Sequence, residues 1–105
     1  MQRQWDNDYA VEYGVETVEA VGALLEGEPP YTYAFIRCAV IELIRALDVY
    51  RLMSDDARFS DLMVDDAAKV VFSRAYEVKK QLPRVQELRQ RRNDAAREYN
   101  EQHGA

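Results

Sequence analysis

Residues that build disulfides, metal sites and turns are scarce in this sequence of 105 residues. It contains one cysteine, one histidine, four glycines and three prolines. One cysteine excludes an intramolecular disulfide framework, and with one histidine it excludes most zinc sites built from this chain alone. The few glycines and prolines provide few turns, which disfavours a fold of many strands. There is also no glycine-rich phosphate-binding loop.

Long hydrophobic runs are missing as well. The longest stretch without a charge, 29–36, contains two prolines. Nothing approaches the roughly 20 apolar residues of a membrane span, and residues 1–6 lack the apolar segment of a secretory signal. Because a single cysteine suits a reducing compartment, we expect a cytoplasmic protein that does not enter a membrane.

The sequence has helical periodicity almost throughout. We expect a first helix at about 8–26, ended by Gly27 and two prolines. A second is expected at 33–53 with Thr32 as N-cap, and a third at 61–82 with Ser60 as N-cap. Pro83 is expected to stop or kink the chain before a last helix at 84–101. The predicted fold is all-α: one domain over 1–105, a small antiparallel bundle of three long helices plus a charged C-terminal helix after Pro83.

The buried faces are predicted from apolar residues that recur every four and three positions. The second helix is also apolar on its other sides, one of which carries Cys38, so we expect it to be packed on several sides. The predicted stripes are Val11, Val15, Val18, Gly22 and Leu25 in the first helix, Ile36, Val40, Leu43, Leu47 and Tyr50 in the second, and Val64, Ala68, Val71, Ala75, Val78 and Leu82 in the third.

Charge is distributed unevenly within a net charge of −5. Residues 1–36 hold seven acids and one base, whereas residues 69–105 hold five acids and nine bases. The two ends therefore either attract each other, within one molecule or between two, or select a partner by the sign of its charge. The arginines of the C-terminal segment are diluted by acids, which disfavours direct nucleic-acid binding.

The first helix carries the candidate partner-binding residues. Glu12, Glu16 and Glu19 share one side of it. Residues four apart on a helix are about 6 Å apart along the axis, which is comparable to the spacing of phosphates, so this face is a candidate mimic of a nucleic-acid backbone. Its alternative is an ordinary solvated face. The candidate anchors Trp5, Tyr9 and Tyr13 either serve a protein interface or pack within the bundle.

No pattern in the sequence specifies a catalytic, cofactor-binding or metal site. Cys38 and His103 lie in segments that make a catalytic pair improbable. All-α pyrophosphohydrolases of the MazG type hold Mg²⁺ with Glu-Glu-x-x-Glu and Glu-x-x-Asp. This chain has Glu16 and Glu19 without the doubled glutamate, so it does not match. The aspartates of 55–66 lack the glycine and the spacing of an EF-hand.

Elimination leaves a protein that acts by binding another protein, and the motifs resemble no known family. We expect a non-enzymatic inhibitor or adaptor, a small acidic protein that occludes a basic, nucleic-acid-handling surface of its target. By size and charge it is similar to the anti-defence proteins of phages and mobile elements. One alternative is a homo-oligomeric assembly protein, for instance a homodimer. A further alternative is a small all-α metal-dependent hydrolase.

Overall fold

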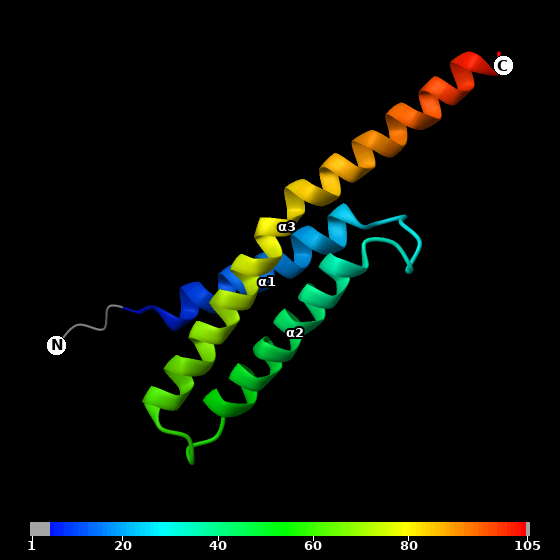
Figure 1. Cartoon of the computed structure of the whole chain (residues 1–105). Coiled ribbons are helices and arrows are strands. Elements are labelled where there is room, and N and C mark those ends of the chain that lie inside the picture. The colour runs from blue at the N-terminus through cyan, green and yellow to red at the C-terminus, as the bar shows by residue number, and fades with distance from the viewer. Residues whose placement is uncertain (1–4, 105) are drawn as a thin grey trace.

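The computed structural model describes residues 5–104, which contain three α-helices and no strand. The helices are α1 (Asn7–Leu24), α2 (Ala34–Ser54) and α3 (Asp61–Gln102). Helices that follow each other in the chain run in opposite directions, and α1 and α2 both pack against the first half of α3 (Figure 1). The predicted all-α bundle is therefore confirmed.

The expected separate helix after Pro83 does not form. α3 is one helix of 42 residues with Pro83 inside it. Proline removes one backbone donor and its ring crowds the preceding turn. Val78 and Val85 are both fully buried, so the same buried stripe is anchored on either side of the proline. This tertiary packing keeps the helix continuous where local preference favours a break.

The last part of α3 projects beyond the other two helices, and the molecule measures 68 × 25 × 16 Å (Figure 1). Every described residue from 91 onward is exposed. Ion pairs between neighbouring turns support this part, including Glu87–Arg91 and Asp94–Arg97, each at 2.6 Å. This end of α3 therefore contributes no buried residue to the core.

The buried face of α1 differs from the predicted one. Ala10, Gly14, Thr17 and Val21 are buried, whereas Val11, Val15 and Val18 of the predicted stripe are half-buried and Gly22 is exposed. The predicted stripe is thus rotated by one residue from the observed face within α1, while its last member, Leu25 at the C-cap, is buried as predicted. The small side chains of the observed face let α1 approach its neighbours closely, which leaves the valines on its flank.

At Gly14 the α1 backbone comes close to both other helices. A Cβ atom added there would lie 2.7 Å from Val71 Cγ1 of α3 and 3.4 Å from Leu47 Cδ2 of α2. Thr17, one turn further on, is fully buried, and its hydroxyl donates to the Tyr13 carbonyl at 2.7 Å. The polar group in this contact is therefore satisfied within its own helix.

α2 is buried on one side only, which corrects the expectation of several-sided packing. Ile36, Leu43 and Leu47 are buried as predicted. Cys38, on one of the sides that we expected to be packed, is exposed. The reason is that α1 and α3 cover one side of α2, and within residues 5–104 no fourth helix covers the rest. Other exposed apolar residues of α2 are Phe35, Ile41, Ile44, Val49 and Leu52.

The helix starts are set by different means. Ser60 caps α3 as predicted by accepting from the Met63 amide at 3.3 Å, and Asp6 caps α1 by accepting from the Tyr9 amide at 3.2 Å. Thr32 does not cap α2. Its hydroxyl donates to the Pro29 carbonyl instead, and the N-cap position is Tyr33, a left-handed residue with φ 54°.

We expect substitution of Gly14 and of Gly22 by alanine to change stability in opposite directions. Alanine in place of glycine inside a helix gains up to about 1 kcal/mol. At Gly22 nothing lies within 4 Å of the added Cβ, so Gly22→Ala should raise the free energy of unfolding. At Gly14 the stiff, buried Val71 side chain must move, at a cost of about 1–3 kcal/mol, so Gly14→Ala should lower it.

Urea denaturation followed by circular dichroism at 222 nm measures both variants. The double variant Gly14→Ala/Val71→Ala removes the clash. Its loss of unfolding free energy should therefore be smaller than the sum of the losses of the two single variants. Equal effects at the two glycines would contradict the close approach of α1 to α3.

Candidate functional site

The predicted acidic face is the outer surface of α1. Glu12, Glu16 and Glu19 are exposed and lie on the side of the helix opposite to its buried residues. Within residues 5–104 no ion pair involves any of the three. Successive carboxylates are about 4.5–6 Å apart along the axis. The face therefore presents three uncompensated negative charges in a row.

The predicted aromatic anchors are brought together, but on another side of α1. Trp5 meets the edge of Phe72 with ring centroids 5.6 Å apart, and Tyr13 stacks on Phe72 at 4.8 Å. Tyr9 stacks on Tyr13 at 6.3 Å and is 57% exposed. Lys79 Nζ lies 4.3 Å from the centre of the Tyr13 ring. These rings hold α1 against α3, so Tyr9 is the most accessible of the three candidate anchors.

Phe72 is the residue that sequence reasoning overlooked. It stands directly after Val71 of the predicted stripe, one helical step off its axis, where a large ring reaches the flank of the neighbouring helix. The environment of Tyr13 in this ring cluster makes its phenol less acidic. Burial first, and then the nearby phenols of Tyr9 and Tyr76, raise the pKa of Tyr13 above its usual value.

The acidic and basic parts of the chain meet at Glu28, in the connection between α1 and α2. The Glu28 carboxylate accepts from both terminal nitrogens of Arg92, at 2.9 and 3.1 Å. Arg89 lies 3.3 Å from it and also donates to the Leu24 carbonyl at 2.8 Å. The Glu28 side chain is only 5% exposed. The junction ties the connection to α3 just where α3 leaves the bundle.

This pairing lowers the pKa of Glu28. The hydrogen bond from Arg92 is the main cause, and the positive charges of Arg92, Arg89 and Arg37 add to it, against a smaller opposing effect of burial. The attraction expected between the two ends of the chain is therefore satisfied within one molecule at this point. It does not use the three glutamates of the acidic face.

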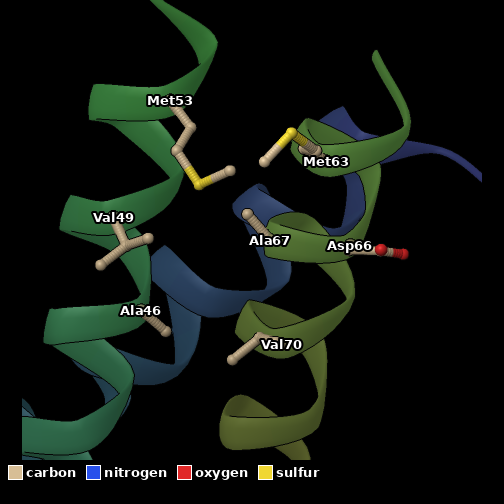
Figure 2. Close-up of a pocket in the computed structure, with 7 residues that line it drawn as sticks. All are labelled: Ala46, Val49, Met53, Met63, Asp66, Ala67 and Val70. Atoms are coloured by element: carbon tan, nitrogen blue, oxygen red, sulfur yellow. The ribbon is translucent and has the colours of Figure 1, made fainter. Parts of the chain in front are cut away.

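An apolar cavity of about 360 Å³ opens between α2 and the start of α3. Figure 2 shows Met53 and Met63 reaching toward each other across it, while Asp66 points away. Flexible methionines adapt to different apolar shapes. The remaining lining residues are Ala46, Val49, Ala67 and Val70.

The residues considered for catalysis are not assembled into a site. Cys38 is exposed near the start of α2, whereas His103 stacks on Tyr99 at the far end of α3. In the described part of the chain, no three His, Cys, Asp or Glu side chains are grouped so as to hold a metal ion. Among the same residues, no helix combines the length and the apolarity needed to cross a bilayer.

Comparison of the chain with protein-family models, with curated proteins and with solved structures finds no match.

We expect the contribution of Glu28 to stability to depend on pH. Because its pKa is lower in the folded than in the unfolded protein, its stabilising effect is present above the unfolded value of about 4.3 and is lost as pH falls through the folded pKa. Glu28→Gln should thus destabilise the protein at pH 7 and much less at pH 3.

Urea denaturation of both proteins at the two pH values tests this expectation. Glu26→Gln is the matched control, because Glu26 is exposed and lies two residues away. A Glu28→Gln effect that is equal at pH 7 and pH 3 would show that the charge of Glu28 is not what stabilises the junction.

Proposed function

We propose that this protein acts without catalysis, as an inhibitor or adaptor that binds another protein through the outer face of α1. The observation that carries the proposal is the row formed by Glu12, Glu16 and Glu19, exposed and without ion pairs in residues 5–104. Uncompensated charges of one sign steer a partner of opposite charge to the surface that displays them.

The proposed partner has a basic surface that handles nucleic acid. The three carboxylates follow one rigid helix at spacings of about 4.5–6 Å, close to the spacing of backbone phosphates. A helix held in place by its neighbours loses little entropy on binding. Occlusion of such a surface in the cytoplasm, in the manner of phage and mobile-element anti-defence proteins, is the form of the proposal that we favour.

The arginines of α3 that follow Pro83 support a protein partner over direct contact with nucleic acid. Arg84 and Arg91 pair with Glu87, and Arg97 pairs with Asp94. Arg89 and Arg92 are engaged by Glu28. Since each of these five guanidinium groups already faces a carboxylate, the basic end of the chain offers phosphates little free positive charge.

Tyr9 is the aromatic residue that we assign to the edge of this interface. It begins the ring cluster with Tyr13 and Phe72 and remains largely exposed beside the acidic face. Trp5 and Tyr13 are half-buried and position α1, so we expect their substitution to affect folding as well as binding.

The combined substitution of Glu12, Glu16 and Glu19 by glutamine should abolish partner binding and leave the helix content unchanged. The control replaces Glu77, Glu98 and Glu101 of α3 by glutamine, which changes the net charge equally on another surface. Each protein, immobilised, is used to capture proteins from a cytoplasmic extract, and bound proteins are identified by mass spectrometry and eluted with duplex DNA.

We expect the wild type and the control to retain a nucleic-acid-binding protein that DNA displaces. The Glu12/Glu16/Glu19 variant should not retain it. Purified, that protein should bind the triple variant at least about 100-fold more weakly in calorimetry, if three charge contacts are worth about 1 kcal/mol each. Unchanged affinity of the triple variant would refute the role of the acidic face.

A further inference from the structure

A second surface of the protein lies on α2, on the exposed flank of the helix that borders α1. Arg37, Ile41, Ile44 and Asp48 are spaced by four, three and four residues, so they form one stripe along the helix. Ile41 is 47% and Ile44 40% exposed. The stripe begins with a positive charge, has two isoleucines at its centre and ends with a negative charge.

Beside this stripe, α1 and α2 leave an apolar groove between them. Two adjoining hollows of about 470 and 250 Å³ share Val18 and Ile44 in their linings. Val15 and Val18 of α1, which are half-buried and which the sequence pattern assigned to the core, form the far wall. The groove has the apolar lining of a helix–helix interface, yet within the described chain no helix occupies it.

We propose that a second copy of this chain fills the groove, with the two α2 helices packed antiparallel about a two-fold axis near residues 42 and 43. In this arrangement Ile41 of one copy meets the second copy's Ile44, and the reverse contact follows by symmetry. Arg37 of each copy then faces Asp48 of the other. The spacing of four and three residues suits antiparallel helices that cross at about 20°.

The argument for a second copy is the charge order of the stripe. A two-fold axis places the stripe of the second copy in the opposite direction. The positive end of each stripe then faces the negative end of the other, and the apolar centres face each other. An interface between identical copies must be self-complementary in this way. The cavity of Figure 2 has no such order, since Asp66 is the one charged residue in its lining.

The charged ends of the stripe are available for this contact. Asp48 is exposed and has no ion pair in residues 5–104. Arg37 uses its Nε to donate to the Thr32 carbonyl at 2.6 Å and its Nη2 to donate to the Pro29 carbonyl at 3.0 Å. A guanidinium has five N–H groups, so Arg37 can bond to these two carbonyls of the α1–α2 connection and still donate to a carboxylate.

The dimer and the proposed function use largely different residues. Glu12 and Glu16 lie on the outer face of α1, and Glu19 alone of the three touches the rim of the groove. Loss of the dimer and loss of a foreign partner are therefore separate results, measured on different variants.

Light scattering over a range of protein concentrations tests the interface. The wild-type chain should be a dimer, and Ile44→Glu should raise the dimer dissociation constant at least about 100-fold, because it buries an unpaired carboxylate. The matched control is Leu62→Glu, which makes the same change at an exposed leucine of α3 and should leave the dimer intact. Circular dichroism confirms that both variants are folded.

A pair of charge reversals tests the two-fold arrangement itself. Asp48→Arg alone places two positive charges together at each end, and Arg37→Asp alone places two negative charges together, so each should weaken the dimer about tenfold or more. Mixed in equal amounts, the two variants should form a heterodimer of near wild-type affinity, because every end of the stripe again meets its opposite charge.

Three results would overturn the proposal. They are a wild-type chain that stays monomeric at millimolar concentration, a dimer that survives Ile44→Glu, and reversed variants that do not recombine although both are folded. If Arg37→Asp fails to fold because the Pro29–Thr32 connection is released, Asp48→Arg still decides between the outcomes. The dimer dissociation constant of Asp48→Arg must be higher than that of the wild type, and the difference must shrink as added salt screens the repulsion.

Discussion

The close approach of α1 to α3 at Gly14 is the contact on which the rest of this structure depends. Because Gly14 has no side chain, Val71 and Leu47 pack directly against the α1 backbone. This contact sets both the distance of α1 from its neighbours and its rotation about its own axis. That rotation turns the three glutamates to the outside, sets the tyrosines against Phe72 and leaves the valines beside α2. The acidic face and the apolar groove are thus two consequences of one steric constraint.

α3 is the element that organises the remainder. Its first part, as far as the buried Val85, supports both other helices. Its last part projects beyond them, with ion pairs between its own turns, and is tied to the bundle at the Glu28 junction. Only α1 and α3 pack against α2, and they cover one side of it, so apolar side chains remain at its surface. The two proposed interfaces follow from this arrangement: a charged face on α1 for a foreign partner, and a groove beside α2 for a second copy.

Much of this architecture was predictable from the sequence. The periodicity located α2 and the buried stripe of α3 almost residue by residue, and Ser60 was the cap that its position suggested. The face of α1 was predicted one residue out of place, because hydrophobicity ranks Val11 and Val15 above Ala10 and Gly14, while helix packing here selects for small size. Phe72 was missed because it flanks a stripe instead of belonging to it. For the candidate site, the sequence identified the glutamates and the aromatic residues but not the contact of those rings with Phe72 of α3.

What the sequence by itself determined is local: helical periodicity, the apolar stripes, the charge asymmetry and the three glutamates on one helix side, all of which depend on neighbours within a few turns. The tertiary structure alone decided the continuity of α3 through Pro83, the exposure of Cys38, the pairing of Glu28 with Arg89 and Arg92, and the open groove beside α2. Each of these depends on which helices meet and how closely, and that distance is set by side-chain volume at contacts between residues far apart in the chain.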